Sequence, residues 1–321
     1  MGISNYLYAR MEKGLQKLIS SDEEQRAEKF ARIVKDENAE LTFAVWGDPQ
    51  ISCISPLRSA RVYSAVRDLK NAEDMDALVL CGDITEYGAK CEYKFVKRLI
   101  DEAGAGVKRV LAVSGNHDVR LRRHKKQLKR FQNFVKSLDK GDIDLSDSYY
   151  YIRDLNGYRF IMMGTDRSTF EAAYISDTQL ERLKNDILSA PEGKPVFVFN
   201  HQTLKRTNGL PVTFLGKGKW RGSVGRESEK LKNVLSLRKN VFFITGHLHY
   251  CTSKYTYEDC GNFKALSVPT VGVINHGDFK TMTQGYVISV YEDKVIMRSR
   301  IFGEGRYVPG SVPNSYIEVL L

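Results

Sequence analysis

Five short apolar runs, each followed at once by polar residues, constrain the fold of this chain more than any other feature of its sequence. The runs occupy residues 41–46, 77–81, 110–113, 196–199 and 241–245. Each run is too short for a helix, and each lacks the strict alternation of a half-exposed strand. We therefore predict five strands that are buried on both faces, as the strands of a parallel sheet are.

Stretches with helical periodicity, such as residues 56–74 and 90–104, separate these strands. Alternation of strands and helices predicts βαβ crossovers and a largely parallel sheet. The C-terminal part differs from this pattern. Closely spaced alternating runs at 251–259, 262–268, 284–293 and 294–302 predict antiparallel strands there.

The same pattern divides the chain into an N-terminal arm and one larger domain. Residues 1–40 are predicted to form a helical arm, since apolar residues recur at spacings of three and four from Leu7 to Leu18. We expect this arm to pack on the rest of the chain or on a partner. Residues 41–321 show no internal repeat and no Pro/Gly-rich linker, which favours a single domain.

Chemically reactive side chains follow the carboxyl end of every one of the five strands. In chain order they are Asp48, Gln50, Asp83, Asn116, His117, Asp118, His201, His247 and His249. Loops at this edge of an open α/β sheet converge on one crevice. Buried carboxylates need a counter-charge, and divalent metal ions supply it. Oxygen and imidazole donors suit Mn, Fe, Zn or Ni, and this set is too large for one tetrahedral zinc ion.

The order of these motifs resembles that of the calcineurin-like metallophosphoesterases. The motifs are GDPQ, GDITE, GNHD, a lone histidine and GHLH, and the resemblance covers roughly residues 41–300. It implies a four-layer α/β sandwich, in which two mixed β-sheets pack face to face between helices. It also implies a dinuclear metal site at the carboxyl ends of the strands. The first metal would be held by Asp48, Gln50 and His249, the second by Asn116, His201 and His247, and both by a bridging Asp83.

The resemblance implies hydrolysis of a phosphomonoester or phosphodiester by a hydroxide that bridges two divalent transition metal ions (Mn, Fe or Zn). His117 would protonate the leaving oxygen or stabilise charge on the transferring group. Asp118 would orient His117 by accepting the second ring hydrogen. Two positions depart from the family pattern. Gln50 replaces a histidine, which predicts either weaker metal binding at the first site or a preference for Mn or Fe over Zn. Glu86 stands where Asp, Asn or Gly is more familiar.

The charge balance favours an anionic partner, here the phosphoester substrate. Lysines and arginines total 49 against 39 acidic residues, and segments 119–136 and 203–226 contain no acid. The second segment follows His201 directly and contains five glycines, so we expect a lid over the crevice. Lys219, Trp220 and Arg221 on this lid, and His276 elsewhere, are predicted to contact the substrate.

Two alternatives stay open. The basic run at 119–136 suggests a nuclease, although nucleic acid is not favoured because no basic groove with interleaved aromatic residues is evident. A catalytically inactive scaffold of the same fold is the other.

The five cysteines form no C-x-x-C pair and predict reduced thiols in the cytoplasm. No apolar run is long enough for a membrane span, and the sequence leaves the oligomeric state open.

Overall fold

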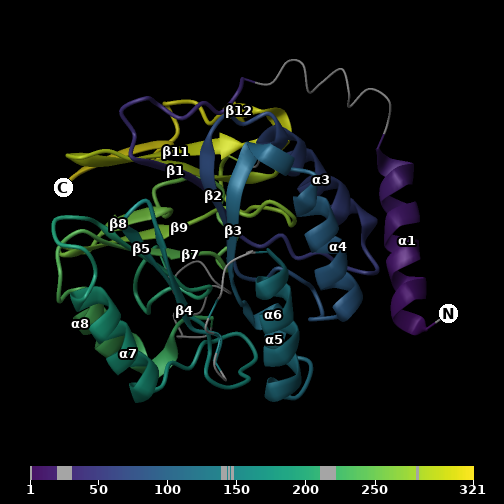
Figure 1. Cartoon of the computed structure of the whole chain (residues 1–321), viewed down its shortest axis with the longest axis horizontal. Helices are drawn as coiled ribbons and strands as arrows, with labels where there is room; N and C mark the ends of the chain where they lie inside the picture. Colours follow the sequence, from purple (N-terminus) through teal and green to yellow (C-terminus); the bar gives the residue numbers. More distant parts are fainter. Residues whose placement is uncertain are drawn as a thin grey trace.

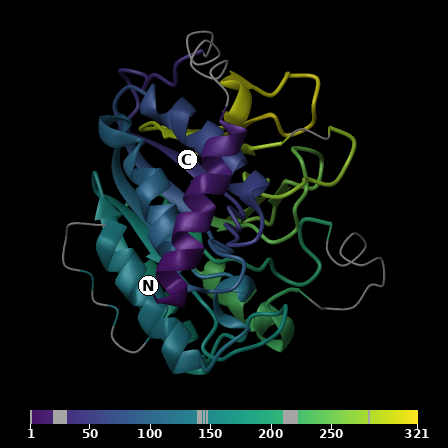
Figure 2. The same cartoon turned by 90° about the vertical axis from the view of Figure 1, so that its right-hand side faces the viewer.

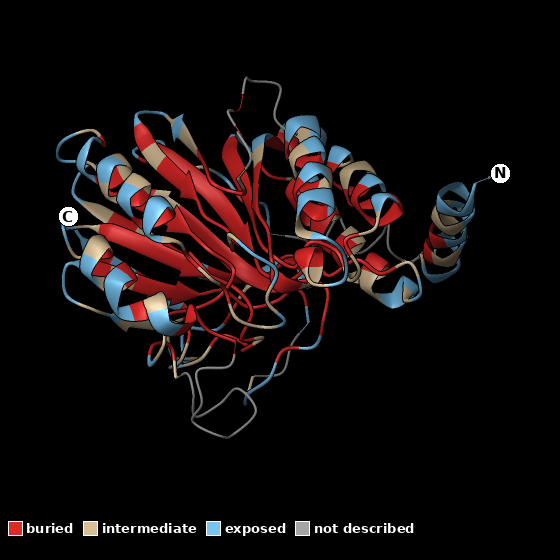
Figure 3. Cartoon of the chain, turned by 90° about the horizontal axis from the view of Figure 1, so that it is seen from below, coloured by how far each residue is buried: buried red, intermediate tan, exposed pale blue. Residues whose placement is uncertain are grey.

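Two mixed β-sheets pack face to face with helices on their outer surfaces in the computed structural model (Figures 1 and 3). The structure describes residues 2–19, 31–138, 143, 145, 148–209, 222–279 and 282–321. This architecture confirms the four-layer α/β sandwich that the sequence predicts.

The first sheet joins the N-terminal and C-terminal parts of the chain. Its strand order is β12-β11-β10-β1-β2-β3, and β13 pairs with β11. Strands β1, β2 and β3 run parallel to one another, whereas β10 lies antiparallel to β1. The bounds are β1 (Leu41–Trp46), β2 (Met75–Cys81), β3 (Val107–Val113), β10 (Gln284–Val290), β11 (Lys294–Ile301), β12 (Arg306–Tyr307) and β13 (Tyr316–Leu320).

The second sheet has the order β4-β5-β6-β7-β9-β8. Strands β5, β6, β7 and β9 are parallel, and the outer strands β4 and β8 are antiparallel to their neighbours. The bounds are β4 (Tyr151–Leu155), β5 (Tyr158–Met162), β6 (Val196–Phe199), β7 (Val241–Thr245), β8 (Tyr257–Asp259) and β9 (Phe263–Ser267).

All five strands predicted from the apolar runs are present, and β1, β2, β6 and β7 are buried along their whole length. The C-terminal predictions are partly wrong. Residues 251–259 form a strand only over 257–259, and β9 pairs in parallel with β7 as well as antiparallel with β8. Side chains alternate between the two faces of a strand in parallel and antiparallel sheets alike. The alternating pattern therefore could not reveal that β9 has a parallel neighbour.

Aromatic side chains fill the space between the sheets. The centroid of the Phe43 ring on β1 lies 5.0 Å from that of Phe160 on β5 and 5.1 Å from that of Phe197 on β6, and both pairs are edge-to-face. Because edge-to-face rings bury large apolar areas at a favourable orientation, these contacts fix one sheet on the other. The strand ends that carry the polar motifs are thereby brought together.

Helices cover the outer faces of both sheets (Figure 3). Helix α3 is tied to the first sheet by a buried ion pair, in which Arg300 Nε and Nη2 each lie 2.7 Å from a carboxylate oxygen of Asp68. Pro56 opens α3 at a position where a missing N–H costs nothing. The helix bounds are α1 (Ile3–Leu18), α3 (Pro56–Lys70), α4 (Lys90–Asp101), α5 (Asn116–Val119), α6 (His124–Leu138), α7 (Asp177–Leu188) and α8 (Ser228–Leu235).

The N-terminal helix α1 packs on α3 and α4 (Figure 2). Met11 and Leu15 are its buried residues, and Glu12 forms an ion pair of 2.8 Å with Arg98 on α4. The division of the chain into an arm and a domain at residue 40 stays a prediction. Within the ranges that the structure describes, no helix has the length and apolar character needed to cross a membrane.

Candidate metal centre

Loops from both sheets bring the predicted ligands to one place. Asp48 and Asp83 follow β1 and β2 of the first sheet, while His201 and His247 follow β6 and β7 of the second. The two sets of loops approach closely at Gly82, where a Cβ atom would collide with the His201 ring. The positive φ of Gly82, +83°, is a second reason for glycine here.

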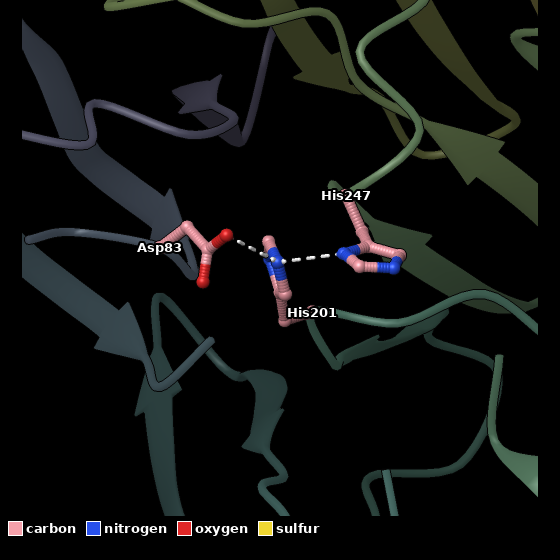
Figure 4. A group of neighbouring side chains, drawn as sticks. All are labelled: Asp83, His201 and His247. Atoms are coloured by element: carbon pink, nitrogen blue, oxygen red, sulfur yellow. Dashed lines mark hydrogen bonds and ion pairs between the residues drawn. The ribbon is translucent and has the colours of Figure 1, made fainter. Parts of the chain in front are cut away.

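The centre of the site is formed by Asp83, His201 and His247 (Figure 4). One ligand atom from each lies within 4.8 Å of the others, and all three residues are buried. His201 Nε2 is 3.2 Å from Asp83 Oδ2 and 3.2 Å from His247 Nδ1. The other ring nitrogen, Nδ1, lies 2.9 Å from the Cys81 carbonyl oxygen. A histidine whose outer nitrogen is held in this way is oriented for metal binding through the other.

Asp48 and His249 extend this cluster. Asp48 Oδ1 is 2.9 Å from His249 Nε2 and 3.8 Å from His201 Nε2. Asp48 Oδ2 accepts a hydrogen bond of 3.1 Å from the His247 backbone N–H. The fully buried Asp48 carboxylate therefore lies between the central group and His249.

The two predicted amide ligands provide the test of whether the site fits metal ions. Gln50 Oε1 and Asn116 Oδ1 are both buried, and neither has a hydrogen-bond partner among the described residues. A buried oxygen without a partner costs about 1–3 kcal/mol. The Asn116 amide nitrogen, in contrast, donates to Glu171 Oε2 at 3.1 Å. Oxygen, carboxylate and imidazole donors thus share the crevice, and the residues present fit divalent transition metals.

Backbone conformation supports the same conclusion. Positive φ values are unfavourable for residues other than glycine and cluster at functional sites. Five of the seven predicted ligands have them: Asp48 (46°), Gln50 (43°), Asp83 (45°), His247 (71°) and His249 (54°). The fold therefore maintains strained turns at these strand ends.

Electrostatics in the metal-free crevice centre on His201. Burial lowers the pKa of His201, but the nearby Asp83 and Asp48 carboxylates outweigh this effect and raise it to about 10. Burial and the neighbouring His201 hold the pKa of His247 well below its usual value. In the absence of metal, one proton on His201 therefore supplies part of the positive charge that the carboxylates require.

His117 lies beside the central group on the first turn of α5. Its Nε2 is 3.8 Å from Asp83 Oδ2 and 2.9 Å from Gln50 Nε2. Its Nδ1 is 2.8 Å from Arg120 Nη2 and 3.3 Å from Glu86 Oε1. Burial lowers the pKa of His117, whereas Asp83 and Glu86 raise it above the usual value. The ring is therefore close to the carboxylate predicted to bridge the metals.

The predicted role of Asp118 is wrong. Its carboxylate oxygens accept hydrogen bonds from Thr85, Tyr93 and the backbone N–H groups of Ile84 and Gly115, not from the His117 ring. Adjacent residues of a helical turn point about 100° apart, so the two side chains diverge. Asp118 instead fixes the loop after β2, which carries Asp83, against the turn that begins α5. Burial raises the pKa of Asp118 to about 6.

The crevice also contains charged residues that the sequence did not assign to it. Glu171 lies in the loop between β5 and α7 and forms an ion pair of 2.9 Å with Arg120. Arg58 on α3 forms an ion pair with Glu86 and donates a hydrogen bond of 3.2 Å to the Gln50 carbonyl. The unusual glutamate at position 86 of the second motif could have indicated the ion pair with Arg58. Glu171 lies in no motif, so the sequence offered no reason to place it at the site.

The predicted substrate contacts are mostly outside the described residues. Lys219, Trp220 and Arg221 fall there, and so does half of the proposed lid, residues 210–221. His276 is described and exposed, and its ring stacks on that of His249 with centroids 6.1 Å apart and planes inclined by 13°. His276 is thus the neighbour of a predicted metal ligand.

Comparisons with known proteins agree with this geometry. A curated relative from Rhodococcus erythropolis, named a probable cyclic nucleotide phosphodiesterase, is 26% identical over 180 residues. This match covers 56% of the chain and 52% of the relative, so the chain spans about half the length of the curated relative. A purple acid phosphatase from yellow lupin (Lupinus luteus) seeds has the same fold, with a TM-score of 0.61 at 14% identity over 84% of this chain and 52% of its own.

Residues 41–251 match the family model described as calcineurin-like phosphoesterase. The matched region contains all the predicted ligands, from Asp48 to His249. The chain therefore belongs to the calcineurin-like phosphoesterase family.

Proposed function

We propose that this chain hydrolyses phosphoesters at a centre of two divalent transition metal ions, Mn, Fe or Zn. The observation that carries the proposal is the pair of buried amide oxygens, Gln50 Oε1 and Asn116 Oδ1, which lack hydrogen-bond partners among the described residues. They lie in a crevice that also holds carboxylates and imidazoles with converging ligand atoms. Most buried polar groups in proteins are hydrogen-bonded, so two such oxygens beside converging carboxylates and imidazoles are candidates for metal ligands.

Three ligands are available for each ion. Asp48, Gln50 and His249 would hold the first, and Asn116, His201 and His247 the second, with Asp83 shared between them. The 2.9 Å approach of Asp48 to His249 supports the first set, and the close grouping of Asp83, His201 and His247 supports the second. Bound ions would lower the pKa of a water ligand towards neutrality, so that hydroxide is available as the nucleophile.

The residues of the chain would bind and orient the ester around this centre. Two divalent ions and the carboxylates of Asp48 and Asp83 leave a net charge of about +2, which attracts a phosphate group. His117 Nε2 lies 3.8 Å from Asp83 Oδ2, so its ring is placed to donate a proton to the leaving oxygen. His276, stacked on His249, would contact the part of the substrate that extends from the phosphate.

A phosphodiester is the substrate class we favour. The curated relative is named a probable cyclic nucleotide phosphodiesterase, whereas the purple acid phosphatase is similar at the level of fold alone.

A nuclease is the second candidate. The exposed basic residues close to the GNHD turn favour it: Arg122, Arg123, Lys125, Lys126 and Lys129. We further propose a cytoplasmic location, in keeping with five free cysteines.

An ester panel tests the proposal. Metal-free protein is assayed with bis(p-nitrophenyl) phosphate, p-nitrophenyl phosphate, a 3′,5′-cyclic nucleotide and single-stranded RNA, each with Mn, Fe, Zn or Ni. We expect diester hydrolysis that a chelator abolishes and that Asp83→Asn eliminates. The matched control, Asp101→Asn, changes an exposed carboxylate on α4 and retains activity. RNA cleavage with a steep salt dependence would favour the nuclease. No turnover on any ester would leave the inactive scaffold.

A further inference from the structure

We propose that Glu171 and Arg120 form a positioning pair, which sets the orientation of the metal ligand Asn116 and of the His117 ring. The inference rests on the proposed function, because it assigns roles at the same metal centre. Neither residue belongs to a motif that predicts ligands. Glu171 comes from the loop between β5 and α7 in the second sheet, whereas Asn116, His117 and Arg120 follow β3 in the first.

The Glu171 carboxylate connects Asn116 to Arg120. Its Oε2 accepts a hydrogen bond of 3.1 Å from Asn116 Nδ2, and its Oε1 lies 2.9 Å from Arg120 Nη1. The Arg120 side chain is 14% exposed and that of Glu171 is 26% exposed. Because both charges are mostly shielded from water, this pair is screened less than an ordinary surface ion pair.

The first consequence concerns Asn116. A carboxylate can only accept hydrogen bonds, so Glu171 holds the amide nitrogen of Asn116 and leaves Oδ1 turned the other way. That oxygen is buried and has no hydrogen-bond partner among the described residues. The negative charge of Glu171 also polarises the amide and raises the electron density on Oδ1. Glu171 would therefore strengthen Asn116 as a metal ligand without contacting the ion itself.

The second consequence concerns His117. Arg120 Nη2 lies 2.8 Å from His117 Nδ1, and Glu86 Oε1 lies 3.3 Å from the same ring nitrogen. These contacts hold one edge of the ring. The other ring nitrogen, Nε2, is therefore the one that lies 3.8 Å from Asp83 Oδ2. Arg120 thus helps to set which nitrogen of His117 faces the Asp83 carboxylate.

The loop that carries Glu171 is attached to both sides of the site. Gln202, next to His201, donates a hydrogen bond of 3.2 Å to the Glu171 carbonyl, and the Ser168 hydroxyl donates one of 3.3 Å to the Val119 carbonyl. The Phe170 ring covers the Arg120 guanidinium at 5.1 Å. These contacts hold the pair at a fixed distance from both sheets, as a positioning role requires.

Metal titration separates this role from a merely structural one. Calorimetric titration of Mn²⁺ into metal-free protein compares wild type with Glu171→Gln, which keeps the shape but cannot accept from both partners. We expect Glu171→Gln to weaken Mn²⁺ binding at one site roughly 10- to 100-fold. The thermal midpoint of the metal-free protein stays the same. In an Asn116→Ala background the same substitution has no further effect on affinity. Glu181→Gln, an exposed change on α7, is the matched control and binds as wild type.

Arg120→Lys tests the other half of the pair. This variant retains Mn²⁺ affinity, lowers kcat more than KM changes and alters the pH profile of kcat. Arg306→Lys, at an exposed ion pair with Glu304, is the control and leaves kcat and its pH profile unchanged. Unchanged Mn²⁺ affinity in Glu171→Gln, or additive losses in the double variant, would overturn the role of Glu171. An unchanged kcat and pH profile in Arg120→Lys would overturn that of Arg120. If wild-type protein binds no Mn²⁺, the proposed function itself fails.

Discussion

Competition between a proton and a metal ion at His201 gives the most quantitative prediction. In the metal-free crevice the Asp83 and Asp48 carboxylates overcome the effect of burial and raise the pKa of His201 to about 10. The Nδ1 atom faces the Cys81 carbonyl, so the additional proton is on Nε2, the nitrogen that faces the crevice. A metal ion needs that same nitrogen in its deprotonated form, and binding must therefore displace the proton.

The expected size of the effect follows from this pKa. At pH 7.5 His201 is almost fully protonated, so metal binding releases about one proton from it, and affinity rises about tenfold per pH unit below pH 10. His247 adds nothing, because its pKa lies well below the usual value and its ring is already neutral. Because the pKa of His201 is higher in the folded chain than its ordinary value, protonation of His201 stabilises the metal-free fold. This contribution is complete below about pH 6.5 and is lost as the pH rises through about 10.

Calorimetry measures both quantities. Mn²⁺ is titrated into metal-free protein at pH 6.5, 7.5 and 8.5, in pairs of buffers with different ionisation enthalpies, so that released protons are counted. A parallel series in His117→Ala removes the other histidine whose pKa is raised. We expect about one proton released at the His201 site in both proteins. Affinity that is independent of pH across this range, with no proton released, would refute the electrostatic reasoning.

Three further predictions follow from the contacts described above. Asp83→Asn removes the shared carboxylate, and elemental analysis is expected to find that both metals are lost. Equal metal content in this variant and wild type would exclude Asp83 as the bridge. His117→Ala is expected to keep both metals and to lower kcat by roughly 10²–10⁴-fold, the usual contribution of a general acid. Loss of metal in this variant would make His117 a ligand instead. Arg300→Met leaves Asp68 buried and unpaired, and denaturant unfolding should show a loss of about 3–5 kcal/mol, whereas a loss below 1 kcal/mol would contradict the fully buried pair.

The sequence predicted the strands and the polar residues that gather at their ends because both depend on short local patterns. Asp48, Asp83 and His201 each follow a continuous apolar run, and the edge at which such strands end is determined by the parallel arrangement itself. The positions that departed from prediction depend on side-chain direction. Asp118 is next to His117 in the chain, but the helical turn sends its carboxylate to the loop after β2.

Tertiary pairing explains what the sequence could not reveal. Glu171 is 55 residues from Asn116 in the chain, and it reaches the crevice only because two sheets pack together. The N-terminal helix gives a second case. The spacing of its apolar residues predicts a helix but does not identify its ionic partners. In the structure Glu12 pairs with Arg98, whereas Arg10, Lys13 and Lys17 are exposed.

Titration of activity against metal tests the central claim most directly. Metal-free protein is assayed for hydrolysis of bis(p-nitrophenyl) phosphate while Mn²⁺ is added in small increments at a protein concentration well above the dissociation constants. The account predicts no turnover without metal and an increase in rate that levels off at two equivalents of Mn²⁺ per chain. A plateau at one equivalent, or hydrolysis that persists in the presence of a chelator, would contradict a centre in which two ions share Asp83.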